Sequence, residues 1–344
     1  MNRVPERVAI VMLSAVGDVV HVMPVVHSLR ASNPGVHITW IIQPGPHGLV
    51  AGHPAIDEFL VFDRRRGWRA FADLRRSLRG RRFDLVLALQ TYLKAGLITT
   101  MLDSPRKLGF DRARSRDLSW LFTPERIAAR PARHMQDQYL EFVEHLGIPA
   151  ALEWGLGSTA GETARYSGIL PPFPGPTVAL VAGTTRPGKE WPAERYAGLA
   201  DRLHAELGAR TVLVGGRSAR EEEVAGVIGA RAAHPPLDLR EWDLRRLAYL
   251  LAASDVVVSP DTGPLHIAVA LGTPAVALMG YTNPKRVGPY RFRELLIDAY
   301  GEPGENYPAS AGNRPGRMER ITVDAVLARV RLALERYPRE TPAH

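Results

Sequence analysis

Apolar, β-branched runs alternate with amphipathic helical stretches along this chain, and the alternation constrains the fold more than any other feature. Strands that are separated by helices favour parallel sheets. The predicted strands are Val8–Leu13, His37–Ile42, Leu60–Phe62, Leu85–Leu89, Val178–Ala182, Thr211–Val214, Val256–Ser259 and Ala275–Leu278. The predicted helices are Val19–Ser32, Trp68–Leu78, Tyr92–Leu102, Met135–Leu146, Ala193–Leu207, Ala219–Ile228, Leu244–Ala252, Leu265–Leu271 and Val323–Arg336.

A segment rich in glycine and proline, residues 149–176, separates the two series of strands and helices. Such composition is typical of a linker. We therefore predict an α/β protein with two Rossmann-like domains, residues 1–165 and 166–320, that face a central cleft. Residues 321–344 form a last helix and a tail, and we expect this helix to pack back on the N-terminal domain. Ligands of open α/β sheets bind at the carboxyl ends of the strands, so both domains should present those ends to the cleft.

Composition and missing motifs exclude several classes of protein. The chain has no cysteine, which excludes disulfides, zinc–thiolate sites and thiol catalysis. The apolar run Val8–Leu13 is too short for a secretory signal, and Gln90 and Lys94 interrupt the longest apolar stretch. Gly-x-Gly-x-x-Gly, Walker A, Gly-x-Ser-x-Gly, His-Glu-x-x-His and Asp-x-Asp motifs are all missing from the sequence. Nicotinamide dehydrogenases, P-loop NTPases and metal–diphosphate sites are therefore disfavoured.

The segment from Asp255 to Pro274 is the strongest candidate binding site. It predicts a strand, a tight turn Asp261-Thr262-Gly263 and the start of a helix. Free backbone N–H groups and the positive end of the helix dipole make such a turn a site for phosphate or diphosphate. Thr262 adds a hydroxyl, Gly263 permits close approach, and His266 lies on the first helical turn. The alternative is a helix that is simply capped by Asp261.

Two other strand ends in the second half carry polar loops. The loop at 182–192 contains Lys189, one of only four lysines, whose ammonium suits a phosphate; the alternative is a solvated loop lysine. The loop at 215–218 precedes three glutamates at 221–223, and a carboxylate there can hold ribose hydroxyls. Acidic residues that complement a helix dipole are the alternative interpretation.

In the first half, Asp18 follows the first strand and a glycine turn, at the carboxyl edge of the predicted sheet. A carboxylate that faces the cleft can act as a general base toward an attacking hydroxyl. The alternative is a helix N-cap. His21 lies three residues further along nearly the same helix face and is a weaker candidate.

Arginine clusters give the chain a formal net charge of +8. The clusters are Arg64, Arg65 and Arg66 with Arg69, then Arg75, Arg76, Arg79, Arg81 and Arg82, and lastly Arg112, Arg114 and Arg116. Either they form a solvated face, or they bind an anionic ligand, a membrane or nucleic acid. Few aromatic residues interleave and no nucleic-acid motif occurs, so we expect no nucleic-acid partner.

Together these segments resemble the bacterial ADP-heptose:lipopolysaccharide heptosyltransferases, which form glycosyltransferase family 9 and have the GT-B fold. The resemblance covers nearly the whole chain. The blocks that carry it are Ser14-x-x-Gly17-Asp18-x-x-His21 with Pro24, Gln90-x-x-x-Lys94, Gly109–Arg116, Thr184-Thr-Arg-x-x-Lys189-x-Trp191-Pro192, Asp261-Thr-Gly-Pro-Leu-His266 and Gly280-Tyr-Thr-Asn-Pro284.

The resemblance implies a role for each matching residue. It makes Asp18 the general base. It also makes the N-terminal domain, which contains Asp18, the acceptor-binding domain and the C-terminal domain the donor-binding domain. The implied donor contacts are Thr184, Thr185, Lys189, Asp261, Thr262, Gly263 and His266. For ribose, Glu221 and Glu222 both fit, with Glu222 preferred, and Trp242 falls where the adenine would pack. Arg64, Arg65, Arg66 and Arg116 match the basic residues that hold the phosphorylated acceptor.

The function implied by the resemblance is inverting, metal-independent transfer of heptose from ADP-heptose to the lipopolysaccharide inner core. The ADP-sugar is a substrate, and no cofactor is expected. The acceptor is lipid-linked and anionic, which would place the protein in the cytoplasm, peripherally at the inner membrane. Three alternatives remain: a family 9 transferase with another sugar nucleotide or surface-glycan acceptor, a sugar-nucleotide epimerase, and a non-catalytic nucleic-acid-binding protein.

Overall fold

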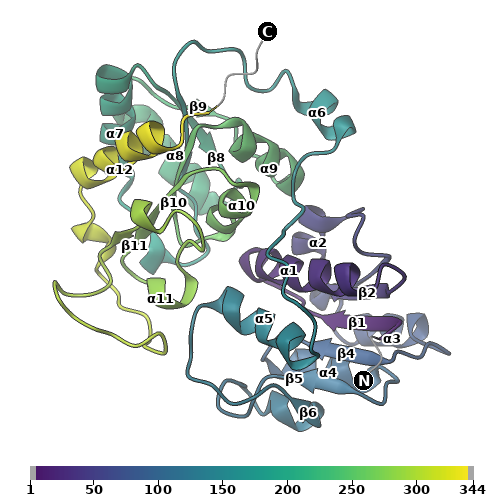
Figure 1. Ribbon diagram of the computed structural model, residues 1–344. Helices are drawn as coiled ribbons and strands as arrows, with labels where there is room; N and C mark the ends of the chain where they lie inside the picture. The colour runs from purple at the N-terminus through teal and green to yellow at the C-terminus, as the bar shows by residue number, and fades with distance from the viewer. Residues whose placement is uncertain (1–4, 340–344) are drawn as a thin grey trace. The chain divides into compact units, whose positions relative to one another are not determined.

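The computed structural model describes residues 5–339, and the chain divides into two compact units between Gly155 and Leu156 (Figure 1). Each unit contains one six-stranded sheet whose paired strands are all parallel. The prediction of an α/β protein with two Rossmann-like halves is therefore confirmed. Residues 1–4 and 340–344, at the ends of the predicted first domain and of the predicted tail, lie outside the described residues.

The first unit has the strand order β3-β2-β1-β4-β5-β6. Its strands are β1 (Arg7–Val11), β2 (His37–Ile42), β3 (Glu58–Val61), β4 (Leu85–Ala88), β5 (Lys107–Gly109) and β6 (Glu125–Arg126). Its helices are α1 (Val16–Ser32), α2 (Pro44–Val50), α3 (Trp68–Ser77), α4 (Leu93–Met101) and α5 (Met135–His145), with the 3₁₀ helices η1 (Arg64–Arg66) and η2 (Ser119–Phe122). The central strands β1 and β4 consist almost entirely of buried apolar residues. Helices cover both faces of a parallel sheet, so side chains on either face are buried.

The second unit has the strand order β12-β11-β10-β7-β8-β9. Its strands are β7 (Thr177–Val181), β8 (Arg210–Val214), β9 (Leu237–Asp238), β10 (Val256–Pro260), β11 (Ala275–Met279) and β12 (Ile297–Asp298). Its α-helices are α6 (Ala160–Tyr166), α7 (Ala193–Leu207), α8 (Ala219–Arg231), α9 (Leu244–Ala253), α10 (Gly263–Leu271), α11 (Pro284–Val287) and α12 (Val323–Arg336). The 3₁₀ helices are η3 (Pro187–Lys189), η4 (Arg293–Leu295) and η5 (Met318–Arg320).

Both sheets reverse their direction of growth at one point. The chain runs outward from β1 through β2 to β3 and then returns to place β4 on the other side of β1. In the second unit, β10 returns to the other side of β7 in the same way. Ligands of such sheets bind outside the carboxyl ends of the strands at this switch point. The polar loops after β1, β4, β7 and β10 therefore lie where this topology places a ligand.

The boundary between the units differs from the predicted one at residue 165. Residues 156–165 belong to the second unit, because Arg245 on α9 donates to the carbonyl oxygens of Leu156 at 3.1 Å and Gly157 at 2.7 Å. Arg245 also pairs with Glu162 of α6. The proline-rich stretch before β7 is likewise part of this unit, and the Arg210 guanidinium stacks over the Phe173 ring at 5.0 Å.

The last helix has the predicted bounds, but the expectation that it packs back on the N-terminal domain is wrong. α12 lies against α7 in the second unit, as Figure 1 shows in yellow and teal. Its apolar face is part of the core of that unit, through the buried residues Val326, Leu327, Val330 and Ala333. Burial of this face within its own unit accounts for the difference. Among residues 5–339, no helix is both long enough and apolar enough to cross a membrane.

Candidate functional site

A buried carboxylate, Asp261, lies directly after β10 at the switch point of the second unit. Its Oδ2 atom is 2.6 Å from the Lys189 Nζ atom, and its Oδ1 atom is 3.3 Å from the His266 Nε2 atom. Burial by itself would raise the pKa of Asp261, but the His266 hydrogen bond and the Lys189 charge outweigh it and hold that pKa well below its usual value. The carboxylate is thus ionised and links the loop after β7 to the start of α10.

The start of α10 is not capped by Asp261, contrary to the alternative interpretation of the sequence. The N-cap residue is Thr262, and its side chain makes no hydrogen bond to the helix N-terminus. The Thr262 hydroxyl instead lies 3.2 Å from the Ser259 hydroxyl. Pro264 has no N–H group and the Leu265 N–H donates to the Thr262 carbonyl oxygen at 3.1 Å, so it is chiefly the positive end of the helix dipole at Gly263 that suits an anion.

Lys189 is more constrained than an isolated loop lysine. Its ammonium donates to the Asp261 carboxylate and, at 2.8 Å, to the Asp261 carbonyl oxygen. An ammonium has three donors, so one remains beyond these two contacts. The side chain is 18% exposed, which leaves it accessible at the carboxyl edge. The structure therefore brings three predicted residues, Lys189, Asp261 and His266, into one charged cluster.

The two predicted threonines after β7 lie in the loop that leads to Lys189. The Thr184 hydroxyl accepts a hydrogen bond from the Arg186 backbone N–H at 3.2 Å, which shapes the turn. Thr185 is exposed. Both lie at the same carboxyl edge as the cluster of Lys189, Asp261 and His266, because β7 and β10 are neighbours in the sheet.

Glu221 and Glu222, the two candidates for ribose, have different environments. Glu221 accepts hydrogen bonds from the backbone N–H groups of Gly216 at 3.0 Å and Ser218 at 2.9 Å, so its carboxylate is committed to the turn. Glu222 is half-exposed and pairs with Arg240 and Arg217. The Arg240 hydrogen bond is the main reason that the pKa of Glu222 is lowered. Glu222 is therefore the more accessible carboxylate at the end of β8.

Trp242 provides an exposed aromatic face at the same strand end. Its side chain is 68% exposed, which is unusual for tryptophan. The ring lies so close to Gly216 that a Cβ atom there would be 2.7 Å from it. The absence of a side chain at Gly216 thus allows the indole to lie over the loop after β8.

Asp18 lies at the switch point of the first unit, in the first turn of α1. Its Oδ2 atom accepts a hydrogen bond from the Ala15 backbone N–H, and its Oδ1 atom accepts one from the Tyr139 hydroxyl, both at 3.1 Å. The N-cap of α1 is Ala15, so the interpretation of Asp18 as N-cap is wrong, although its carboxylate does satisfy the N-cap amide. Asp18 remains partly exposed at the sheet edge.

Two residues that hold this turn came from distant parts of the chain. Gln90, after β4, accepts from the Leu13 backbone N–H at 3.0 Å and donates to the Ser14 carbonyl oxygen at 2.6 Å. Gln90 belongs to a block noted in the sequence, but the role of Tyr139 was missed. Tyr139 is on α5, 121 residues from Asp18, and no local pattern indicates the contact.

His21, the weaker candidate base, has a structural environment. It is 5% exposed and faces α5. Its Nδ1 atom is 3.1 Å from the Gln136 Oε1 atom, and the Gln136 amide donates to the His21 carbonyl oxygen at 2.9 Å. Its ring also meets the His134 ring edge-on at 5.7 Å. These contacts favour a packing role for His21.

The predicted arginines are mostly at the surface. Arg64, Arg65 and Arg66 form η1 after β3 and are all exposed. Arg65 pairs with Asp63 at 3.0 Å, and Arg66 pairs with Asp73 at 2.8 Å. These pairs reduce the local positive charge but leave the guanidinium faces exposed to solvent.

The third cluster is divided. Arg116 is exposed, and its backbone N–H donates to the Thr91 carbonyl oxygen at 3.1 Å, which joins the loops after β5 and β4. Arg114 is 8% exposed and pairs with the buried Glu141 at 2.8 Å, so the prediction that it belongs to a basic face is wrong. A buried guanidinium needs such a partner.

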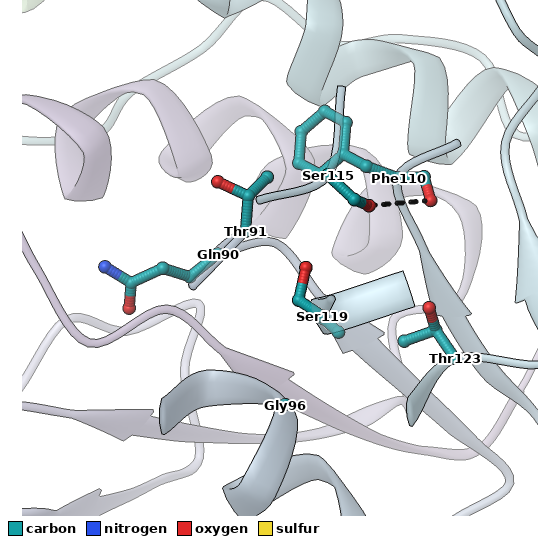
Figure 2. Close-up of a pocket in the computed structure, with 8 residues that line it drawn as sticks. Gln90, Thr91, Gly96, Phe110, Ser115, Ser119 and Thr123 are labelled. Atoms are coloured by element: carbon teal, nitrogen blue, oxygen red, sulfur yellow. Dashed lines mark hydrogen bonds between the residues drawn. The ribbon is translucent and has the colours of Figure 1, made fainter. Parts of the chain in front are cut away.

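A small cavity lies beneath these joined loops (Figure 2). Hydroxyl groups contribute much of its lining, and Figure 2 shows the Ser115 hydroxyl bonded to the Phe110 carbonyl oxygen. Its volume is about 10 Å³. That is about the room needed by one water molecule, so the cavity does not hold a sugar.

Elsewhere in residues 5–339, no three His, Asp or Glu side chains form a group suited to a metal ion.

The chain is similar in sequence and in fold to known proteins. The model of glycosyltransferase family 9 (heptosyltransferase) matches residues 71–303. The lipopolysaccharide core heptosyltransferase OpsX of Haemophilus influenzae is 29% identical over 95% of this chain and 96% of its own length. A glycosyl transferase family 9 structure from Veillonella parvula has a TM-score of 0.81, 23% identity, and coverage of 96% of this chain and 98% of that one. Escherichia coli heptosyltransferase WaaC with ADP-2-deoxy-2-fluoro heptose has a TM-score of 0.72 and 25% identity, over 95% and 99% of the two chains.

Proposed function

The chain belongs to glycosyltransferase family 9, and from this we propose that it transfers heptose from ADP-heptose to the lipopolysaccharide inner core. It is a glycosyltransferase of the GT-B fold. One observation carries the proposal for the donor: anion-binding and aromatic groups follow one another along the carboxyl edge of β10, β7 and β8. The nucleotide part of a nucleoside diphosphate sugar has a matching order of diphosphate, ribose and base.

The donor would lie along this edge. The first turn of α10, with Thr262 and Gly263, would receive the diphosphate, as helix N-termini do. Glu222 and Trp242 would contact the ribose and the adenine at the end of β8. The ligand of the E. coli WaaC structure, ADP-2-deoxy-2-fluoro heptose, supports adenine as the base and heptose as the sugar.

The departing ADP would be stabilised by protein charges alone. The remaining Lys189 donor and the dipole of α10 face the edge where negative charge develops. Asp261 would act by holding Lys189 and His266 in place. It would not contact the donor directly, because a carboxylate beside the diphosphate would repel the phosphate groups. We infer a metal-independent reaction from this set of cations and amides.

Asp18 would act as the general base. The attacking acceptor oxygen bonds to the anomeric carbon while the bond from that carbon to the phosphate oxygen breaks. The hydroxyl proton passes to the Asp18 carboxylate, and ADP leaves. Attack from the face opposite the leaving group inverts the anomeric centre. The backbone and Tyr139 hydrogen bonds hold the carboxylate at the sheet edge for this step.

The preference of the protein for one nucleobase, adenine over uracil or guanine, tests the assignment of the donor. ADP at about one hundred times its dissociation constant should raise the stability of the protein by about 2.7 kcal/mol, and UDP and GDP should raise it less. Thermal unfolding with each nucleotide measures this. No shift with any nucleoside diphosphate would remove the donor site. A clear preference for UDP would leave the fold assignment unchanged but would contradict ADP-heptose as the donor. Product that forms without an acceptor would indicate an epimerase.

The exposed arginines of η1 are proposed to hold phosphate groups of the acceptor. Replacement of Arg64, Arg65 and Arg66 with alanine should raise the apparent Michaelis constant for the acceptor, because charge-assisted hydrogen bonds are lost. The ADP-induced thermal shift should not change. Initial rates over a range of acceptor concentrations measure the effect.

A matched control removes the same charge at and just beyond the C-terminal end of α3, at Arg75, Arg76 and Arg79, which are also exposed. If both triple variants raise the constant equally, the effect is one of net charge. If neither does, η1 does not bind the acceptor.

A further inference from the structure

An exposed apolar surface lies on the first unit, apart from the residues that the proposed reaction uses. Its members are Tyr92, Leu93 and Leu97 on and before α4, and Leu118 and Leu121 at η2, with exposed fractions of 46%, 43%, 41%, 60% and 57%. They are five of the eleven large hydrophobic side chains that are exposed among residues 5–339. Single exposed apolar residues need no explanation, but a concentration of them marks an interaction site.

The two segments pack side by side, and their exposed apolar side chains are here called the α4–η2 surface. Leu93 and Leu97 are one helical turn apart and share a face of α4. η2 packs directly on this helix, since a Cβ atom at Gly96 would be only 2.3 Å from the Phe122 ring. Leu118, which directly precedes η2, and Leu121 are therefore carried by an element that packs on α4.

The backbone before η2 is strained in a way that presents a leucine to solvent. Asp117 and Leu118 have φ angles of 48° and 59°, in the left-handed region that residues other than glycine rarely adopt. Such strain persists only where the surroundings impose it, and it is concentrated at functional sites. Leu118 has the most exposed side chain of the surface, so no burial of its own compensates for the strain.

Cations border the surface. Lys94 is exposed beside it, and Arg112 and Arg126 stack over the Trp120 ring at 4.6 and 5.3 Å. An aromatic ring between apolar side chains and guanidinium groups is typical of the boundary between lipid headgroups and acyl chains. The positive charges also favour a negatively charged bilayer, because anionic lipids attract basic residues near their surface.

We propose that the α4–η2 surface docks on an anionic lipid bilayer, with its leucines at the acyl boundary and the bordering cations on the headgroups. The proposal rests on the proposed function only for its purpose, which is access to a lipid-linked acceptor. In the sheet order β1-β4-β5, the loops that precede α4 and η2 follow strands on one side of β1. Docking would therefore bring the edge that carries Asp18 toward the headgroup layer.

The test is sedimentation of the full-length protein with vesicles. Vesicles of phosphatidylcholine mixed with phosphatidylglycerol should bind it, and vesicles of phosphatidylcholine alone should bind it more weakly. The variant Leu118→Asp with Leu121→Asp should weaken binding at least about tenfold, since each change replaces a side chain that would be buried in the bilayer with a negative charge. Arg112→Gln and Arg126→Gln should each weaken it about fivefold.

The matched control is Leu237→Asp, at a leucine of the second unit that is 45% exposed, and it should bind vesicles like the unmodified protein. Melting temperature and the ADP-induced shift check folding, and Leu97→Glu on α4 tests the same surface if the double variant does not fold. The proposal is overturned if the unmodified protein does not bind anionic vesicles, or if the α4–η2 variants and the control behave alike. It is also overturned if these variants dissociate a dimer, since the surface would then pair two copies. The assay contains no nucleotide or sugar, so its result is independent of the donor assignment.

Discussion

Asp18→Asn is expected to slow transfer at least a hundredfold while donor binding and folding stay nearly unchanged. A general base typically contributes about 10²–10⁴-fold to rate, and an amide cannot accept the proton. Asparagine retains an oxygen that can accept from the Ala15 amide or the Tyr139 hydroxyl, so the stability change should be below about 1 kcal/mol. Turnover, ADP affinity and melting temperature of this variant separate the catalytic role from the structural one.

Tyr139→Phe is the companion variant, because it keeps the carboxylate and removes the hydroxyl that donates to it. That hydrogen bond favours the charged carboxylate, so its loss should move the acidic limb of the rate–pH profile to higher pH. A merely structural contact would lower the rate without moving the limb. Turnover of Asp18→Asn close to that of the unmodified enzyme would contradict the assignment of the base. His21 would not replace it, since its ring is buried against α5.

Lys189→Ala is expected to destabilise the second unit and also to weaken donor binding. The substitution leaves the Asp261 carboxylate, which is 8% exposed, with His266 as its remaining partner in this cluster. Removal of one member of a buried ion pair typically costs about 3–5 kcal/mol, and the partial exposure of Lys189 favours the lower end. The midpoint of denaturant unfolding measures this cost, and calorimetric titration with ADP measures the affinity.

The double variant with Lys189→Ala and Asp261→Asn separates the two effects. It should recover part of the lost stability, because no unpaired carboxylate remains in the buried site. Donor affinity should stay low if the ammonium contacts a phosphate. If affinity recovers together with stability, Lys189 acts only through Asp261. Lys189→Arg should restore binding only in part, because a guanidinium is broader and differently hydrated.

The fold was predictable where apolar runs are long and buried on both faces. β2 and β10 are such runs, and α12 has the predicted bounds. The strands β6 and β9 were missed because two residues at a sheet edge carry no periodicity. α2 was missed as well, since it begins with proline and contains glycine, which are typical of loops. The boundary between the units depends on side-chain contacts of Arg245 that no local pattern indicates.

The candidate site was predictable by residue type but not by partner. Polar residues at strand ends were identified from the pattern alone, whereas the pairing of Lys189 with Asp261 joins positions that are 72 residues apart. One distinction was within reach of the sequence. Ser218 and Glu221 have the spacing of a capping box, and the structure contains it, so Glu221 could have been set aside in favour of Glu222.

The placement of α12 bears on how such enzymes diversify. Because this helix stays in the second unit, the described chain passes from one unit to the other once, between Gly155 and Leu156. Each unit is therefore one uninterrupted stretch of the described sequence. A single recombination at that junction exchanges one complete half for that of a relative and leaves both hydrophobic cores intact. If the second unit holds the nucleotide sugar and the first unit holds the acceptor, as proposed above, the two specificities can be inherited separately.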